Sequence, residues 1–163
     1  MIEEVAHFIG DRRALSVGAG RALFELLLHD RGVNIVATDS FDEEWRYTHE
    51  PGPFMPVHEY SAAHAVRVFD PDVLVLVWPA YKESQFDTRI PMASDALRAF
   101  RGHRMVYVGE DSQGCTGDRD FHELVENEWQ DAADVEEDIN EDALDIDQWP
   151  GLHDYVRLLV RRH

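Results

Sequence analysis

The sequence predicts an α/β protein in which strands and helices alternate to build one mostly parallel, doubly wound sheet. Three observations lead to this fold. Residues 72–77 are a continuous apolar run, typical of a central parallel strand covered on both faces. Residues 13–17 form a shorter apolar run that leads into a glycine turn. Between such runs, apolar residues recur at helical spacing.

Each further element follows from its residue spacing or from its ends. Apolar side chains at positions 2, 5, 8 and 9 predict a short amphipathic helix. In the helix after the glycine turn, Ala22, Leu23, Leu26 and Leu27 are expected to face the sheet, and Gly32 ends that helix. The final two strands are expected to pair antiparallel. In chain order, the expected helices cover residues 2–9, 21–30, 61–68, 92–100 and 121–129, and the expected strands cover residues 13–17, 33–38, 72–77, 104–108, 132–139 and 155–160.

The connection at residues 40–56 lacks a regular pattern of apolar residues. It contains the loop sequence Thr48-His49-Glu50-Pro51-Gly52-Pro53. A connection of this length is unusual within a compact domain, which favours a functional lid or rim.

Length and composition indicate a single domain that spans residues 1–163. No apolar run is long enough to cross a bilayer, and the acidic N-terminal residues lack a signal-peptide pattern. Cys115 is the one cysteine, which excludes an internal disulfide and fits a reducing compartment. We therefore expect a cytoplasmic protein without a membrane partner.

The net charge of −18 arises from 33 acidic against 15 basic residues, of which Lys82 is the only lysine. Such a surface repels itself in dilute buffer, whereas molar salt reduces the Debye length to about 3 Å. An acidic chain with almost no lysine resembles the proteins of extreme halophiles, such as haloarchaea and their viruses. The charge also disfavours a nucleic-acid partner, because such proteins normally carry a basic face.

The glycine turn and the next strand have the layout of a nucleoside-cofactor site. A dinucleotide site has glycine at the first, third and sixth places, but here Gly18 and Gly20 are followed by Leu23. A turn of the form glycine-x-glycine-x-small fits instead, with Ala22 as the small residue. It resembles the first motif of class I S-adenosylmethionine (SAM)-dependent methyltransferases. The alternative is a turn that only joins a strand to a helix, against which the position of Asp39 at the end of the next strand argues.

This resemblance implies that SAM lies across the glycine turn, with Asp39 on its ribose and residues near Glu59 and Tyr60 on its adenine. The family usually has an acid where this chain has Ser16, so the contact to the methionine end departs from the family. The cofactor residues that the resemblance implies are Ser16, Gly18, Ala19, Gly20, Asp39, Ser40, Glu59, Tyr60 and Trp78.

The strand expected at residues 72–77 ends in Trp78-Pro79-Ala80-Tyr81, at the edge of the sheet where ligands of this fold class bind. Many amino-group methyltransferases have a polar residue, two prolines and an aromatic there. Here Trp78 replaces the polar residue, so an amine-positioning acceptor is missing, whereas the aromatic Tyr81 is kept. Trp78 either stacks on the cofactor's sulfonium by a cation–π contact or simply ends a core strand. Trp78, Pro79, Tyr81 and Glu110 are the candidates for the substrate pocket.

The loop after the strand expected at residues 104–108 carries three acids and the lone cysteine. Acidic neighbours oppose thiolate formation, so we expect Cys115 to be a buried, packing residue. Glu110 or Asp118 could act as a general base. His153 next to Asp154 suggests an oriented imidazole, although adjacent side chains seldom point the same way. The nine histidines show no metal-ligand spacing, so no metal site is expected.

Further segments resemble a set of small methyltransferase-like proteins that occur in cellular genomes and in viruses. The resemblance covers most of the chain, implies the SAM-methyltransferase fold and supplies no substrate. The segments that carry it are Trp78-Pro79-Ala80-Tyr81, Met92-Ala93, Tyr107-Val108-Gly109-Glu110, Gly114-Cys115-Thr116-Gly117-Asp118-Arg119-Asp120-Phe121, Trp129 and Trp149-Pro150-Gly151-Leu152-His153-Asp154.

Three functions are compatible with these observations. The first is a SAM-dependent methyltransferase whose acceptor is a small molecule or a protein rather than a nucleic acid. The second is a catalytically inactive binding or structural module with the same fold, for example in a viral particle. The third, a nicotinamide-binding protein, is disfavoured by Leu23 and by the short chain.

The charge of the chain predicts stabilisation by salt. We expect the free energy of unfolding to be larger in about 3 M KCl than in about 0.1 M KCl, because salt screens repulsion among the excess carboxylates. Urea denaturation at several KCl concentrations measures this. Equal stability at both salt concentrations would show that the acidic surface is not an adaptation to salt.

Overall fold

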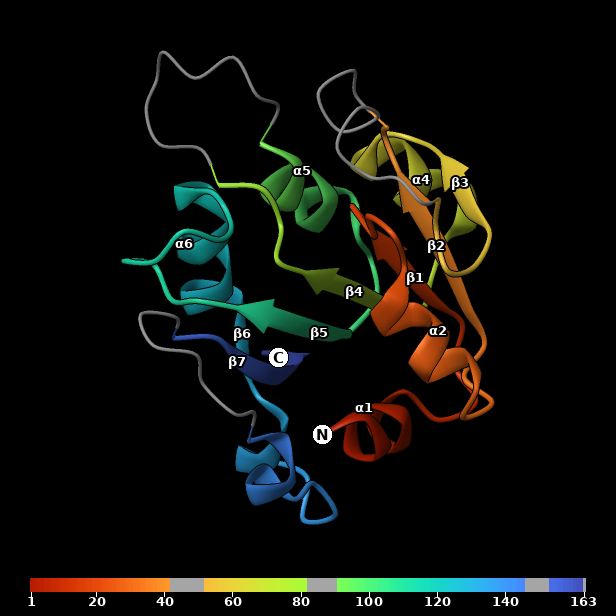
Figure 1. Ribbon diagram of the computed structural model, residues 1–163. Helices are drawn as coiled ribbons and strands as arrows, with labels where there is room; N and C mark the ends of the chain where they lie inside the picture. The colour runs from red at the N-terminus through yellow and green to blue at the C-terminus, as the bar shows by residue number, and fades with distance from the viewer. Residues whose placement is uncertain (42–51, 82–90, 146–152, 163) are drawn as a thin grey trace.

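The computed structural model describes residues 1–41, 52–81, 91–145 and 153–162. Within these ranges seven strands form one sheet in the order β3-β2-β1-β4-β5-β7-β6 (Figure 1). Strands β1 to β5 are parallel, and β7 is antiparallel to both of its neighbours, which confirms the predicted fold class. The strands are β1 (Ala14–Val17), β2 (Ile35–Asp39), β3 (Val57–Glu59), β4 (Val73–Val77), β5 (Arg104–Gly109), β6 (Trp129–Asp131) and β7 (Tyr155–Arg161); the helices are α1 (Ile2–Ile9), α2 (Leu23–His29), α4 (Ala62–Phe69), α5 (Met92–Ala99), α6 (Arg119–Glu128) and the 3-10 helices η1 (Ala132–Asp134) and η2 (Glu141–Leu144).

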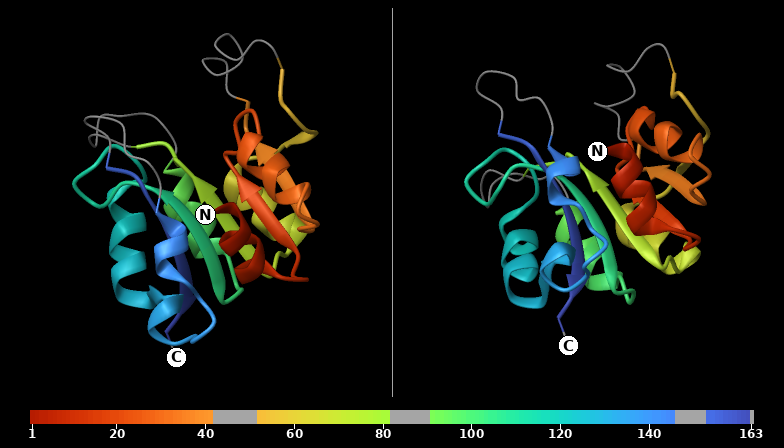
Figure 2. Two further views of the ribbon diagram at one scale, coloured as in Figure 1. Left: turned by 60° about the horizontal axis from the view of Figure 1, so that its bottom comes forward. Right: turned by 90° about the horizontal axis from the view of Figure 1, so that it is seen from below.

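Helices cover both faces of the sheet, as Figure 2 shows. One core layer joins α4, α5 and α6 to residues such as Leu74 and Leu76 of β4. The other joins α1 and α2 to Val73 and Val75 of the same strand. Alternate residues of β4 thus point into opposite layers, and nearly all of its side chains are fully buried. This explains why the central strand reads as an unbroken apolar run.

The predicted inner face of α2 is wrong in part. Leu23 is 50% exposed and Leu27 is also exposed, whereas Leu28 and Glu25 are buried. Ala22, the residue before the helix, has a left-handed backbone with φ 57°. The helix therefore starts later than expected, and positions 25 and 28 face the sheet.

The outer strand lies earlier than residues 132–139. It is β6, whose Trp129 pairs with Arg161 of β7. The Trp129 side chain is buried and stacks on Phe100, with ring centroids 6.2 Å apart. This packing fixes the extended segment directly after α6, and the chain then turns into the 3-10 helix η1.

Much of the predicted lid at residues 40–56 lies outside the described residues. The part that is described, residues 52–56, leads into the short edge strand β3, which the sequence did not predict. None of the described helices combines the length and the apolarity that a membrane span requires.

Candidate functional site

The glycine turn lies at the carboxyl end of β1, beside the carboxyl end of β2. Gly18 and Gly20 have φ of 67° and 58°, a left-handed conformation that favours glycine. The Ala19 amide donates a hydrogen bond to the Thr38 carbonyl oxygen at 3.0 Å. The turn is therefore tied to β2 by backbone, at the edge of the sheet where ligands of open α/β folds bind.

Asp39 points back at this turn. Its Oδ2 accepts a hydrogen bond from the Gly20 amide at 2.9 Å, and its Oδ1 accepts one from the Phe41 amide at 2.9 Å. The side chain is buried. Each carboxylate oxygen has a second lone pair available for a further donor. The acid and the glycine turn, separated in sequence, are thus brought together as the sequence predicted.

Ser16 is fully buried and faces α2 rather than the glycine turn. Its hydroxyl donates a hydrogen bond to Glu25 Oε1 at 2.5 Å, and Thr38 Oγ1 donates one to the Ser16 carbonyl oxygen. Glu25 is only 1% exposed. Burial raises the pKa of the Glu25 carboxyl, the Ser16 hydrogen bond opposes that rise, and the charge of Asp39 adds to it. The buried Glu25 carboxyl group of α2 therefore lies against β1 just before the glycine turn.

Sequence reasoning missed Glu25. It sits within an apolar helix whose leucine spacing pointed to another face. The signal that could have found it is the pairing of a buried serine in β1 with an acid in the following helix.

Met92, the first residue of α5, packs against the glycine turn at Gly18. A Cβ atom added to Gly18 would lie 2.8 Å from the terminal methyl carbon of Met92. The thioether thus contacts the Gly18 backbone. This contact joins α5 to the end of β1, and Met92 had been predicted only as a helix residue.

The described rim near the turn includes Phe54. Its amide donates to the Arg21 carbonyl oxygen at 2.8 Å, and the Arg21 guanidinium lies 4.5 Å from the centroid of its ring. The segment before β3 therefore closes against the residue that follows the glycine turn.

The residues expected near adenine flank Asp39. Glu59 is its register partner in β3 and is exposed, and the Tyr60 amide donates to the Asp39 carbonyl oxygen at 2.9 Å. The Tyr60 ring packs edge-on against Phe69 with centroids 5.5 Å apart. Ser40, next to Asp39, is exposed.

Trp78 follows β4 with a left-handed backbone, φ 46°, which is uncommon for a residue with a side chain. Its amide donates to the Val108 carbonyl oxygen at 2.8 Å, and its side chain is 58% exposed. The indole therefore lies outside the core, directly after the last residue of the central strand β4. Pro79 is buried, and Tyr81 is half-buried at the last described position before residue 91.

Glu110 braces the loop after β5. Its Oε2 accepts from the Cys115 amide at 2.5 Å and its Oε1 from the His153 amide at 3.4 Å. The Cys115 bond, followed by the His153 bond, holds the pKa of Glu110 below its ordinary value against the effect of burial. A carboxylate with a lowered pKa is a weaker general base. Cys115 is exposed, so the expectation of a buried cysteine is wrong: the loop curls around the Glu110 carboxylate, which binds the Cys115 amide.

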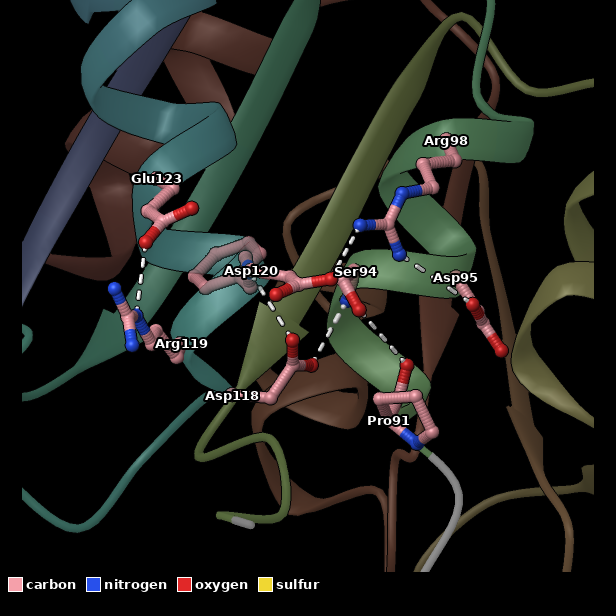
Figure 3. A network of polar contacts seen from close by, with 9 residues as sticks. Pro91, Ser94, Asp95, Arg98, Asp118, Arg119, Asp120 and Glu123 are labelled. Carbon is pink, nitrogen blue, oxygen red and sulfur yellow. Dashed lines mark hydrogen bonds and ion pairs between the residues drawn. The ribbon is translucent and has the colours of Figure 1, made fainter. Parts of the chain in front are cut away.

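Asp118 links two helices (Figure 3). Its Oδ1 accepts from the Phe121 amide at 3.1 Å, as an N-cap of α6. Its Oδ2 accepts from the Ser94 amide in the first turn of α5, also at 3.1 Å. Both oxygens serve the fold, and the side chain is 3% exposed. These contacts favour a structural role for Asp118 over general-base catalysis.

The described residues contain no group of three or more His, Cys, Asp or Glu side chains arranged to hold a metal ion. His153 is exposed, and its amide is engaged by Glu110.

Comparison with known proteins identifies the fold. No protein-family model and no curated protein sequence matches this chain. It is similar to the ribosomal protein L11 methylase from Lactobacillus delbrueckii subsp. bulgaricus, with a TM-score of 0.54 and 17% identity over 99% of this chain and 75% of that chain. The chain has the class I methyltransferase fold. It is likewise similar to the magnesium protoporphyrin IX methyltransferase from Synechocystis PCC 6803 with bound SAM, with a TM-score of 0.55 and 10% identity over 99% of this chain and 78% of that chain.

Asp118 accepts one hydrogen bond from each of two helices, so removal of its carboxylate should cause a large loss of stability. Asp118→Ala leaves two buried amides without an acceptor, so we expect the free energy of unfolding to fall by about 2 to 4 kcal/mol in urea denaturation. Asp118→Asn keeps one acceptor oxygen and should lose less. As a control, Asp120→Ala removes an exposed ion pair with Arg98 and should cost below about 1 kcal/mol. Equal losses of stability in Asp118→Ala and Asp120→Ala would contradict a stabilising role of the two Asp118 hydrogen bonds.

The raised pKa of Glu25 predicts a pH-dependent gain for Glu25→Gln. Between its unfolded and its folded pKa, Glu25 binds more protons in the native state than in the unfolded state, so its contribution to the stability of the parent chain falls as pH rises above about 4. Glutamine keeps an acceptor for Ser16 and does not ionise. The stability of the variant relative to the parent should therefore increase from about pH 4 to about pH 8.

Urea denaturation across that range, with Glu126→Gln on the exposed face of α6 as the matched control, tests this. A difference that stays constant with pH, or one that the control reproduces, would refute the role of Glu25 burial.

Proposed function

We propose that this protein is a methyltransferase that uses SAM as its methyl donor. The observation that carries the proposal is the placement of the Asp39 carboxylate 2.9 Å from the Gly20 amide at the ends of β1 and β2, in a class I methyltransferase fold. Two solved structures of this fold are methyl-transferring enzymes, one of them with bound SAM, which supports the same donor here.

The residues around the turn fit an adenosyl group. Asp39 has a free lone pair on each oxygen for the two ribose hydroxyls. Gly18 and Gly20 let backbone approach a ligand closely. Glu59 and Tyr60 flank Asp39 on the side assigned to adenine. The Ser16 hydroxyl is committed to the buried Glu25, so it does not also serve the methionine end.

When bound, SAM supplies a methyl group on a cationic sulfur, which is already a strong electrophile. The protein therefore needs mainly to align the acceptor and to exclude water. We assign the indole of Trp78, exposed at the end of β4, to stacking on the sulfonium. Pro79 and Tyr81 then form the adjoining wall of the acceptor pocket, and Glu110 shapes its loop without acting as a base.

The net charge of the chain favours some classes of methyl acceptor over others. A net charge of −18 repels the phosphates of a nucleic acid, so a small molecule or a protein is the favoured acceptor.

A second function, a non-catalytic module with this fold, is supported by one observation. The polar groups that could act in chemistry near the turn are engaged within the fold: Ser16 by Glu25, and the carboxylates of Glu110 and Asp118 by backbone amides.

Calorimetric titration with SAM tests the proposal. We expect binding, and we expect Asp39→Asn to weaken it by about 10- to 100-fold, because charge-assisted hydrogen bonds to the ribose are lost. Asp134→Asn removes the same charge from an exposed position on η1 and should leave the affinity within about twofold. Absence of heat and of a thermal shift at millimolar SAM would eliminate the proposal.

Trp78→Ala tests whether the Trp78 indole contacts the sulfonium of SAM. The side chain is exposed, so the variant should fold, and loss of a sulfonium contact should weaken SAM binding by several-fold. Unchanged SAM affinity would remove Trp78 from the cofactor site. SAM binding by the parent chain, without transfer of labelled methyl to any component of a cell extract, would support the non-catalytic module.

A further inference from the structure

A hollow of about 490 Å³ lies at the amino-terminal edge of the sheet, opposite the glycine turn. The starts of β1, β4 and β5 meet there, and the Asp72 amide donates to the Arg13 carbonyl oxygen at 2.9 Å. The hollow is lined by Arg12, Arg13, Asp70, Pro71, Asp72, Arg101, Gly102, His103 and Arg104.

Positive charge is concentrated in this hollow. Four guanidinium groups line it against two carboxylates, whereas the whole chain has 15 basic and 33 acidic residues. A concave site with an excess of one sign of charge attracts small ions of the opposite sign even when the rest of the surface repels them.

Two of the four arginines serve the fold. Arg13 makes a bidentate pair with Asp72, with N–O distances of 3.0 and 3.1 Å. Arg104 pairs with Glu136 at 2.6 Å, and its guanidinium lies 4.6 Å from the centroid of the Phe8 ring. These contacts hold the walls of the hollow in place.

The other two arginines are available to a ligand. Arg12 and Arg101 are exposed, and neither forms an ion pair within the described residues. Among the residues that the structure describes, the Arg12 side chain donates only to the Ile9 carbonyl oxygen at the end of α1. No hydrogen bond of the Arg101 side chain is found within the described part of the chain, so its guanidinium donors are available on the hollow.

We propose that this hollow binds the phosphate groups of a small phosphorylated ligand through Arg12 and Arg101. A guanidinium fork matches phosphate oxygens in geometry and charge, and the volume lies within the range of small-molecule sites. A nucleic acid would need an extended basic face, whereas the strongly acidic chain repels a long polyanion. The site is distinct from the proposed methyl-transfer site, because the two lie at opposite edges of the sheet.

Calorimetric titration with pyrophosphate in about 0.15 M KCl tests this site. We expect saturable binding that Arg101→Gln weakens by about tenfold or more, since one charge-assisted contact is lost. Arg119→Gln is the matched control: the Arg119 side chain is 89% exposed on α6 and pairs with Glu123, so its loss should change the affinity by less than about twofold.

Three results would overturn the proposal: no binding of pyrophosphate, equal weakening by Arg101→Gln and Arg119→Gln, or tighter binding of a single-stranded RNA oligonucleotide than of pyrophosphate. The first two exclude a built anion site, and the third identifies a nucleic-acid surface instead. ATP serves as a second probe, and competition between ATP and pyrophosphate for the parent chain supports one shared phosphate site. An unchanged urea midpoint verifies that Arg101→Gln is folded, and this control does not depend on the proposed SAM binding.

Discussion

The hydrogen bond between the Asp39 carboxylate and the Gly20 amide is the interaction on which the candidate site depends. It joins the carboxyl ends of two neighbouring parallel strands, β1 and β2, and it fixes the left-handed turn that follows β1. It adds to the backbone bond between the Ala19 amide and the Thr38 carbonyl oxygen, and it sets where the carboxylate lies relative to the turn. The same contact leaves acceptor capacity on both oxygens, so one group both builds the turn and can bind a ligand.

Buried carboxylates are the main polar building blocks of this acidic chain. Glu110 closes the loop after β5, Asp118 caps α6 and holds α5, and Glu25 pairs with Ser16 beneath the sheet edge. These carboxylates accept hydrogen bonds from backbone amides or from a hydroxyl, although Glu110 and Asp118 were candidates for a catalytic base in the sequence. The proposed methyl transfer suits such a site, because it asks for alignment more than for proton transfer.

The sequence predicted the features that depend on long or unique local patterns. The apolar run of β4, Val73–Val77, and the pairing of Asp39 with the glycine turn are of this kind. It failed where packing between distant segments decides. The three-residue strand β6 is positioned by the burial of Trp129, and the face of α2 is set by the left-handed backbone of Ala22. The arginine hollow combines residues from three chain segments, which no local pattern reports, and the burial of Glu25 depends on its pairing with Ser16 of β1.

The two hydrogen bonds of Asp118 have a consequence for the neighbouring glycine turn. One carboxylate connects the first turn of α5, through the Ser94 amide, to the first turn of α6, through the Phe121 amide. Met92, the first residue of α5, packs against Gly18. A ligand seated on the glycine turn therefore meets, in Met92, a side chain whose helix is anchored to α6 by a buried acid.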